Sequence, residues 1–512
     1  MTPSQREVDV LVIGGGLGGS STALLLARAR PDLRIVVVER TEHFDRKVGE
    51  ATVEVSGYFL AHVLGLFKTL SHQHLFKHGL RYYFSDGQGR SLAEMTEVGA
   101  VTQPSLASFQ LDRSLLDETV LEHARQAGAE VLRPAKVKRV EHGWPTSEIE
   151  VESDDSTETL RARWIIDASG RQAFLARRKQ LLVELDGHRT SAMWGRWRGT
   201  LDLDRTQPPL PRLKTSRLLA TNHFAGHGWW AWVIPLANGD TSIGLVWDTK
   251  LFAPPPASTT EARYRDFLAS HDGLREVVAG AELIEGDFTL RERLAYRSTQ
   301  YADRGWALIG DAAAFLDPYY SPGLDHVAMS VTATTNLVLE DVRDRCDDAL
   351  DAKLALHNER FVRSTTRWYD ALYRDKYELF GDAELTAAAF AIDTAMYYLG
   401  VVQPVYRDPG ELGIPTLGRE GWKASLAFKV LRFVNRRLVR LARNRRARGT
   451  YGRRNVGWRW MVSDFGSAKL RLTSAHRKGL GLWLAAEWHD FAARFLRTRQ
   501  PVDARAAEAR AS

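Results

Sequence analysis

The chain has 512 residues, 44% of them hydrophobic, and both charge signs are well represented. This composition excludes a disordered chain and predicts a large core divided among more than one domain. The single cysteine, Cys346, excludes an intrachain disulfide and a cysteine-ligated metal, and no other metal site is predicted. The formal net charge of +7 is local, because residues 421–454 carry twelve Lys or Arg and no Asp or Glu.

The N-terminal segment does not predict a secretory signal, because its apolar run contains Asp9 and ends in glycines. No later stretch supplies the uninterrupted apolar residues that a membrane-spanning helix requires. We therefore expect a cytoplasmic protein.

The stretch from Val8 to Glu39 predicts a βαβ unit that binds a dinucleotide. An apolar run leads into glycines, a small-residue helix follows, and a second apolar run ends in Glu39. Gly14, Gly16 and Gly19 permit a tight turn and a close approach of the backbone to a pyrophosphate, and the helix N-terminus offers free N–H groups. Glu39 stands where a carboxylate binds a ribose hydroxyl. A purely structural βαβ crossover is the alternative.

Apolar periodicity places further elements along the chain. Helices are expected at 56–70 and from about 110 to 126. From about 185 to 295, alternating aromatic-rich strands predict a largely antiparallel sheet inserted into the first domain, and residues 306–311 return to the nucleotide-binding sheet. Helical periodicity dominates the remainder, with a loop at 404–415.

Seven motifs between Val8 and about Asn336 resemble, in order, those of the flavin-dependent halogenases, a branch of the FAD monooxygenase fold. The lysine motif and the Trp-x-Trp-x-Ile-Pro stretch are the most diagnostic of the halogenase branch. The motifs are the glycine turn, Gly49-Glu50-Ala51-Thr52, Phe76-Lys77 with Gly79, Leu111-Asp112-Arg113, Asp167-Ala168-Ser169-Gly170 with Phe174 to Arg177, Trp230 to Pro235, and Gly310-Asp311-Ala312 through Asp317-Pro318 to Ser321-Pro322-Gly323.

The resemblance implies an α/β fold: an FAD-binding Rossmann-like domain of the p-hydroxybenzoate-hydroxylase (GR2) type, an inserted antiparallel β-sheet substrate domain and a C-terminal helical region. The expected boundaries are 1–184 and 296–345 for the FAD-binding domain, 185–295 for the substrate domain, and 346–512 for the helical region with its basic helix at 422–454.

The same resemblance assigns further cofactor contacts. Asp311 would accept a hydrogen bond from the ribityl chain of the flavin, and a helix cap is the alternative for this residue. Arg113 would pair with the pyrophosphate or with a carboxylate of its own domain. Ser321 and Gly323 would bring a turn and a helix N-terminus against the isoalloxazine ring. Ala51 and Thr52 complete the expected FAD contacts, together with Gly14, Gly16, Gly19 and Glu39.

Lys77 is the residue that the family places across a tunnel from the flavin. There the lysine hydrogen-bonds hypohalous acid or carries halogen as a haloamine, and burial would lower its pKa enough to permit a neutral amine. An ordinary surface lysine is the alternative. Ser321 and Glu50 are the other expected catalytic residues, Ser321 by shaping the flavin and halide site and Glu50 by gating the flavin channel, where a plain loop is the competing interpretation.

The implied reaction begins with reduced FAD from a separate flavin reductase, which agrees with the absence of a second glycine-rich βαβ unit for a nicotinamide cofactor. Oxygen gives a C4a-hydroperoxide, chloride or bromide attacks it, and hypohalous acid travels to Lys77, where an electron-rich ring is halogenated. The base that removes the ring proton is not identified. Its candidates are Glu50, Glu54, His78 and His326.

Trp230 and Trp232 lie two apart on a predicted strand and therefore face the same side. In the family this stretch runs near the tunnel and is thought to block direct access of substrate to the flavin. The core of an ordinary sheet is the alternative, because alternate tryptophans pack well in any sheet.

Three positions depart from the family pattern. Tyr320 replaces the glutamate of tryptophan-specific members, which favours a phenol, a pyrrole or a carrier-bound aromatic substrate over free tryptophan. Glu54 replaces a proline. Pro322 lacks the backbone N–H that helps to bind halide in the family. This last departure keeps open a flavin hydroxylase that uses no halide.

The predicted helix from Trp422 to Arg448 is amphipathic and basic. It suits an acidic partner such as an acyl carrier protein bearing the substrate, or an anionic membrane surface with peripheral attachment, and a solvated face packed on its own domain is the alternative. No nucleic-acid partner is expected, because no recognition module accompanies the charge. A non-catalytic flavoprotein scaffold that docks through this helix is the remaining hypothesis.

Overall fold

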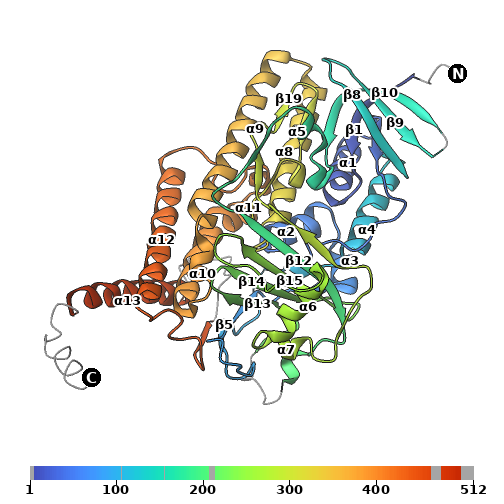
Figure 1. The fold of residues 1–512 in the computed structure, drawn as a ribbon. Helices are drawn as coiled ribbons and strands as arrows, with labels where there is room; N and C mark the ends of the chain where they lie inside the picture. Colours follow the sequence, from blue (N-terminus) through green and yellow to red (C-terminus); the bar gives the residue numbers. More distant parts are fainter. Residues whose placement is uncertain (1–4, 105, 155, 207–213, 463–473, 497–512) are drawn as a thin grey trace, which may run out of the picture.

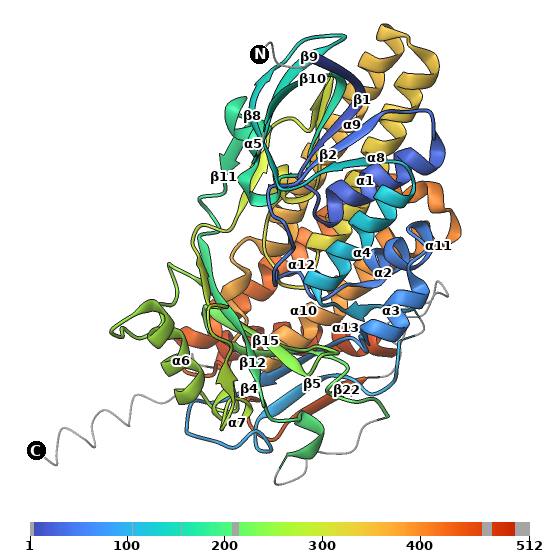
Figure 2. The same ribbon diagram turned by 90° about the vertical axis from the view of Figure 1, so that its right-hand side faces the viewer.

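The computed structural model describes residues 5–104, 106–154, 156–206, 214–462 and 474–496 (Figure 1). Two sheets form its framework, and helices from the C-terminal third of the chain lie beside both of them (Figures 1 and 2). The first sheet has eight strands and the second has nine. The predicted α/β fold class, with a sheet built on a βαβ unit, a second sheet and a C-terminal helical region, is confirmed.

The first sheet is built around the predicted βαβ unit. Its central strands are parallel and run in the order β20, β10, β1, β2, β7. The inner residues of β1, β2, β10 and β20 are mostly apolar and buried, which is what a parallel sheet with helices packed over it requires, whereas β7 at the edge is only partly buried. These strands are β1 (Gln5–Ile13), β2 (Ile35–Val38), β7 (Glu130–Leu132), β10 (Thr157–Asp167) and β20 (Trp306–Leu308).

Three helices surround the glycine turn that follows β1. α1 (Leu17–Ala29) packs against α4 (Arg113–Gln126) and α8 (Gly323–Asp344). The Asp112 carboxylate caps α4 by accepting a hydrogen bond from the Ser114 N–H, which explains why the helix begins there. The predicted helix at 56–70 is divided in the structure into α2 (Glu54–Tyr58), a π-helical turn and α3 (Phe67–Gln73).

The second sheet is larger than the predicted insertion at 185–295. Besides β12 to β17, it takes β4 and β5 from the first part of the chain and β22 from near its end. Two of its pairings, β13 with β4 and β22 with β5, are parallel, so the sheet is mixed. Sequence alternation could not reveal this, because each of these pairings joins segments far apart in the chain. The strands are β4 (Leu80–Phe84), β5 (Thr96–Ala100), β12 (Thr190–Arg198), β13 (Thr221–Gly226), β14 (Trp229–Pro235), β15 (Asp240–Asp248), β16 (Glu282–Leu283), β17 (Thr289–Arg291) and β22 (Arg459–Val462).

The two faces of the second sheet belong to separate cores. Trp230 and Trp232 of β14 pack in one core with residues of α10 (Ala383–Tyr397), while Trp229 on the opposite face packs with α6 (Thr260–Ser270). A strand buried on both faces explains why β14 reads as a continuous aromatic and aliphatic run.

The C-terminal region is helical, as predicted. It contains α9 (Asp347–Trp368), α10, α12 (Trp422–Ala447) and α13 (Ser474–Leu496). The expected loop at 404–415 is wrong in part, because α11 (Gln403–Arg407) and a 3-10 turn (Pro409–Gly413) occupy most of it.

One segment of the C-terminal region contradicts the expectation that no later stretch is apolar enough to span a membrane. The helical stretch Ala383–Arg407 has the length and apolar composition for such a span, yet 67% of its most apolar window is buried inside the protein. Its apolar residues serve the core beside the second sheet.

Candidate functional site

Two glycines of the turn, Gly14 and Gly19, leave no space for a side chain. Gly14 has φ +97°, and a Cβ there would lie 2.7 Å from the Ala168 carbonyl oxygen. A Cβ at Gly19 would lie 1.9 Å from the Gly14 carbonyl oxygen. Gly16 is the N-cap residue of α1 and no side chain caps the helix there. The turn therefore presents bare backbone and a helix N-terminus, which is the arrangement that binds a pyrophosphate.

Glu39 lies at the end of β2, directly beside this turn. Its buried carboxylate accepts hydrogen bonds from the Gly15 N–H at 2.8 Å and from the Thr41 N–H at 3.0 Å. The predicted ribose-binding carboxylate thus also orders the glycine turn.

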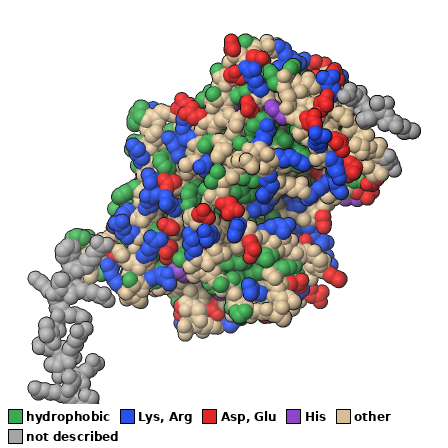
Figure 3. Space-filling model, turned by 45° about the horizontal axis from the view of Figure 1, so that its top comes forward, with side chains coloured by type: hydrophobic (Ala, Val, Ile, Leu, Met, Phe, Trp, Pro, Cys, Tyr) green, Lys and Arg blue, Asp and Glu red, His purple; other side chains and the backbone are tan. Residues whose placement is uncertain are grey.

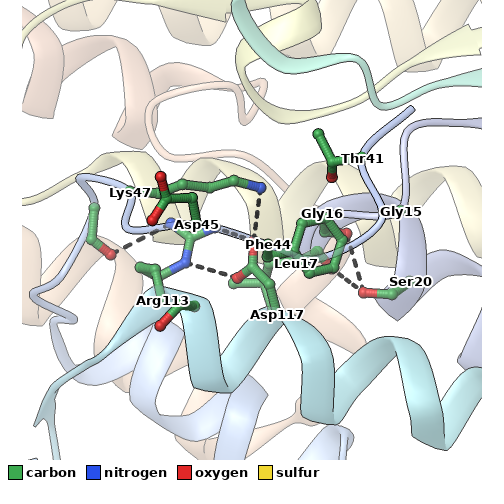
Figure 4. A network of polar contacts seen from close by, with 12 residues as sticks. Gly15, Gly16, Leu17, Ser20, Thr41, Phe44, Asp45, Lys47, Arg113 and Asp117 are labelled. Carbon is green, nitrogen blue, oxygen red and sulfur yellow. Dashed lines mark hydrogen bonds and ion pairs between the residues drawn. The ribbon is translucent and has the colours of Figure 1, made fainter. Parts of the chain in front are cut away.

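Two charged residues that the sequence interpretation missed also lie at the turn (Figure 4). The Asp117 carboxylate is fully buried and accepts hydrogen bonds from Nε and Nη2 of Arg113 at 2.8 and 3.0 Å. It also lies 3.4 Å from the Lys47 ammonium group. Burial alone would raise the pKa of Asp117, but the Arg113 and Lys47 charges hold it below its ordinary value. The spacing of Arg113 and Asp117, one helical turn apart, was the available signal.

Arg113 therefore pairs with a carboxylate of its own domain, which is one of its two predicted partners, and its contact with the pyrophosphate stays a prediction. Its guanidinium also donates to the Val48 and Gly49 carbonyl groups at 3.3 and 3.4 Å. The Asp117 carboxylate thus holds two cations, Arg113 and Lys47, beside the glycine turn.

A cavity of about 210 Å³ lies between α8, α10, α12 and the segment around Lys77. It brings together residues from segments that are hundreds of positions apart. Its lining is mostly apolar and aromatic, with a few titratable groups: Glu54, Lys77, His78, Asp311, Asp317, Asp325, His326 and Asp393. Such a composition is typical of a small-molecule site.

Asp311 and Gly323 line this cavity, as the predicted flavin contacts require. The Asp311 carboxyl accepts no hydrogen bond from any residue that the structure describes, and burial raises its pKa against the opposing Arg171 and Arg113 charges. An acceptor of this kind fits a polyhydroxyl chain such as the ribityl group.

The turn before α8 is strained. Tyr320 and Ser321 have φ values of +73° and +56°, and the Ser321 N–H donates to the Pro318 carbonyl at 2.9 Å. Pro322 is the N-cap residue, and the helix begins at Gly323. The Ser321 N–H is thus already bonded and Pro322 has none, so the N–H groups that remain for an anion are those of the first helical turn.

Lys77 follows a short strand and is 2% exposed. Its ammonium group donates to the Thr52 carbonyl at 2.8 Å, and its backbone N–H donates to the Ser108 carbonyl at 2.7 Å. Burial lowers the pKa of Lys77 to about 8, while the negative charges of Glu54 and Asp325 oppose this shift. The amine is therefore inside the cavity that also contains Asp311 and Gly323, and it is not in bulk water.

Two carboxyl groups share this part of the cavity with Lys77. The Tyr398 hydroxyl donates to the Glu54 carboxylate. Asp325 accepts from the Ser56 N–H and from the Tyr397 hydroxyl, both at 2.8 Å. Burial raises the pKa of both carboxyl groups, and that of Asp325 to about 6.

Asp325 and the two tyrosines were not predicted. The signal available in the sequence was an acid two residues into a predicted helix N-terminus.

The predicted residues Glu50, Ala51 and Thr52 lie near the cavity but do not line it. Arg196 of β12 forms an ion pair with the buried Glu50 carboxylate at 2.7 Å. The Thr52 hydroxyl bonds the Phe109 N–H at 2.6 Å, and Ala51 bridges to Gln110. Glu50 thus anchors the 49–52 loop to the second sheet, and Thr52 contributes its carbonyl group to Lys77.

The two predicted wall tryptophans also lie outside the lining. The Trp230 indole N–H donates to the Tyr377 hydroxyl at 2.9 Å, and that of Trp232 donates to the Ser242 hydroxyl at 3.1 Å. Their rings pack in the core of the second sheet. The two tryptophans therefore belong to the core of a sheet, which was the alternative to a wall beside the tunnel.

Comparisons with known proteins agree with this geometry. The family model described as "FAD binding domain" matches residues 7–340. The chain is 28% identical over 440 residues to flavin-dependent halogenase chlA of Dictyostelium discoideum, which covers 78% of this chain and 71% of that protein. It is 27% identical over 385 residues to flavin-dependent halogenase armH5 of Armillaria mellea, with 70% of each covered.

Solved structures agree as well. Halogenase PltM in complex with phloroglucinol and FAD matches with a TM-score of 0.72 at 18% identity, over 94% of this chain and 96% of that chain. Brominase Bmp2 matches with a TM-score of 0.60 at 19% identity, over 83% of this chain and 98% of that chain. At these identities the likeness establishes a common fold.

Proposed function

Since the chain belongs to the FAD binding domain family, we propose that this FAD-dependent oxidoreductase halogenates an electron-rich aromatic ring. The predicted resemblance to flavin-dependent halogenases is confirmed by the curated relatives. The observation that carries the proposal is a single cavity with the buried Lys77 amine in one part and Asp311 and the α8 N-terminus in another.

The residues present fit FAD. The glycine turn and the α1 N-terminus would hold the pyrophosphate and Glu39 the ribose. The Asp311 carboxyl, which accepts no hydrogen bond from a described residue, would bind the ribityl chain. When bound in its reduced form, FAD supplies the activation of oxygen that oxidises halide to hypohalous acid. A separate flavin reductase provides the reduced cofactor.

Lys77 positions the oxidant and polarises it. Among the residues that the structure describes, its ammonium group donates one hydrogen bond, to the Thr52 carbonyl, so further N–H groups are available for hypohalous acid in the cavity. With a pKa near 8, the amine keeps its proton at neutral pH, which favours hydrogen bonding over a haloamine.

Glu54 is the strongest of the four candidate bases for the ring proton. Glu50 is neutralised by Arg196 and lies outside the lining. His78 bonds the Thr215 hydroxyl at 2.6 Å, and burial lowers its pKa. Burial lowers the pKa of His326 to about 4, which makes it a weak base. Glu54 lines the cavity beside Lys77, and burial raises its pKa toward the range of an effective base.

The substrate proposed for this site is a free phenol rather than free tryptophan or a carrier-bound ring. Tyr320 lines the cavity and donates to Asp393 at 2.9 Å, so an aromatic side chain stands where a tryptophan-specific site needs a carboxylate. Phloroglucinol, the phenol bound in the PltM structure, is the first compound to test. The charges that a carrier protein would bind are mostly paired within this chain.

A halide-independent hydroxylase is the second candidate, and one observation favours it. Neither Ser321, whose N–H is bonded to Pro318, nor Pro322 can offer an N–H to halide. In that reaction the ring would receive a hydroxyl group, and Lys77 would not carry the oxidant.

The deciding experiment supplies phloroglucinol, oxygen and reduced FAD from a separate reductase, with and without bromide, and identifies products by mass spectrometry. A brominated product that requires bromide and is lost with Lys77→Met supports halogenation. A hydroxylated product formed equally without bromide establishes the hydroxylase. Absence of any product from a panel of phenols and pyrroles, free and carrier-tethered, would favour the scaffold hypothesis.

A further inference from the structure

The outer side of α12 carries a stripe of exposed apolar side chains, and so does α13. In each helix four such residues follow one another at steps of four, four and three, so they share one helix face. Trp422 and Trp488 are 72% and 66% exposed, whereas the tryptophans in the two cores of the second sheet are buried. The stripes are Trp422, Leu426, Val430 and Phe433 on α12, and Leu480, Leu484, Trp488 and Phe491 on α13.

The two helices pack against each other, so their stripes belong to one side of the molecule. Arg437 of α12 pairs with Glu487 of α13, and the Phe433 and Trp483 rings lie 6.5 Å apart. In Figure 3, Lys and Arg side chains are interspersed with hydrophobic ones over the side that carries these helices. An apolar surface of this extent on a soluble protein marks an interaction site.

The cations of the basic helix are divided by the fold into two sets. Nine of the twelve predicted cations pair with acidic residues of this chain, such as Asp370, Asp382 and Glu384. Lys423, Lys429 and Arg440 form no ion pair with any residue in the described ranges, and all three are exposed. By helical spacing, Lys429 and Arg440 lie on the same face as the apolar stripe.

From this arrangement we propose that the α12–α13 face docks peripherally on an anionic lipid bilayer. Aromatic and aliphatic side chains enter the interface while lysine and arginine heads reach the lipid phosphates, which is how interfacial helices bind membranes. The opposite face of α12 contributes Ala427 and Leu431 to the cavity wall, so docking places the cavity next to the bilayer.

Two other occupants fit less well. An acidic carrier protein would be recognised mainly through charge, and most of the charge is already neutralised. A second copy of the chain, related by two-fold symmetry, would bring the unpaired cations of one α12 toward those of the other. The C-terminal residues 497–512 contain Pro501 and Val502 but no aromatic residue or leucine, so they cannot match eight large apolar side chains.

The test measures co-sedimentation of the full-length FAD-loaded protein with vesicles of phosphatidylcholine alone and with phosphatidylglycerol added. The wild-type protein should bind the anionic vesicles more tightly. Trp422→Ser/Phe433→Ser should weaken binding roughly tenfold or more, because each removed side chain loses the transfer free energy of burial. The matched control is Phe67→Ser/Leu115→Ser, which changes two exposed apolar residues of the FAD-binding half.

No binding to anionic vesicles would overturn the proposal, as would equal binding by the α12 variant. A concentration-dependent dimer that the α12 variant abolishes, without vesicle binding, would assign the face to a second copy. Vesicle-independent capture of an acidic carrier protein would assign it to that partner. Halogenation of phloroglucinol without vesicles should be unchanged in the α12 variant, which separates this outcome from that of the proposed reaction.

Discussion

The glycine turn and the Lys77 part of the cavity differ in the groups that would act on a ligand: backbone N–H groups at the turn, and ionisable side chains around Lys77. At the turn, the groups that would bind the cofactor are backbone N–H groups, and glycine is needed at positions 14 and 19 because a side chain there would strike the neighbouring backbone. Around Lys77, the working groups are buried titratable side chains whose charges depend on one another. Substitutions at the turn should therefore fail through sterics, and substitutions near Lys77 should preserve the fold while changing the chemistry.

The largest expected effect belongs to Gly19→Val. Its Cβ would lie 1.9 Å from the Gly14 carbonyl oxygen, so the turn must open. We expect loss of FAD binding and a free energy of unfolding lower by more than about 4 kcal/mol. Flavin absorbance after gel filtration and urea unfolding measure these effects. Gly481→Ala, in open space on α13, is the control. A variant that still bound FAD would show that the turn is not the pyrophosphate site.

Lys77→Met should leave the fold and FAD binding intact, because methionine fills similar volume without a buried charge. Halogenation should fall by at least about a hundredfold, since the group that polarises the oxidant is lost. Product formation per reduced flavin is the measurement, and Lys68→Met on the exposed side of α3 is the control. Full activity of Lys77→Met would remove Lys77 from the reaction.

The pH dependence tests the coupling between Lys77 and Asp325. Asp325 should lose its proton as the pH rises through about 6, and Lys77 should lose its proton as the pH rises through about 8. If the reaction needs ionised Asp325 and protonated Lys77, single-turnover halogenation should follow a bell-shaped profile with limbs near these values.

Asp325→Asn should remove the contribution of Asp325 to the acid limb of that profile and leave only the contribution of Glu54, the proposed base. It should also move the alkaline limb to lower pH, because the Asp325 charge raises the pKa of Lys77. Asp344→Asn, at the exposed end of the same helix, should leave both limbs in place. An unchanged profile in Asp325→Asn would mean that the two groups act independently.

The smallest expected effect is that of Glu39→Gln, at the turn. Glutamine keeps one acceptor for the Gly15 N–H but loses the charge that strengthens a bond to a ribose hydroxyl. FAD affinity should fall about tenfold, and the product distribution should not change. Isothermal titration of the apoprotein with FAD measures the affinity. A loss of turnover at saturating FAD would show that the two parts of the site are not separable.

The sequence predicted best those parts of the fold whose contacts join residues close together in the chain. Residues 8–39 form one continuous βαβ unit, so a strand, three glycines and an acid in sequence define it. The second sheet was underestimated, because β4, β5 and β22 join it through pairings with no local signal.

Lys77 was found by its resemblance to a family motif. Its burial and its bond to Thr52 depend on the pairing of two short strands, residues 75–76 and 109–110, and could not be predicted from sequence. The basic helix illustrates the same limit for charge. Its composition suggested an anionic partner, but the acids that neutralise most of it come from the preceding segment of the chain.

The position of β22 at the edge of the second sheet has a consequence for biosynthesis. β5 pairs with residues 459–462, so its outer edge stays open on the ribosome until nearly the whole polypeptide has emerged. The strands of the first sheet, the last of which ends at Leu308, are complete much earlier. The first sheet can therefore form during translation, whereas the second sheet is completed only after residues 459–462 have been synthesised. A chain that is truncated before these residues would leave the edge of β5 unpaired.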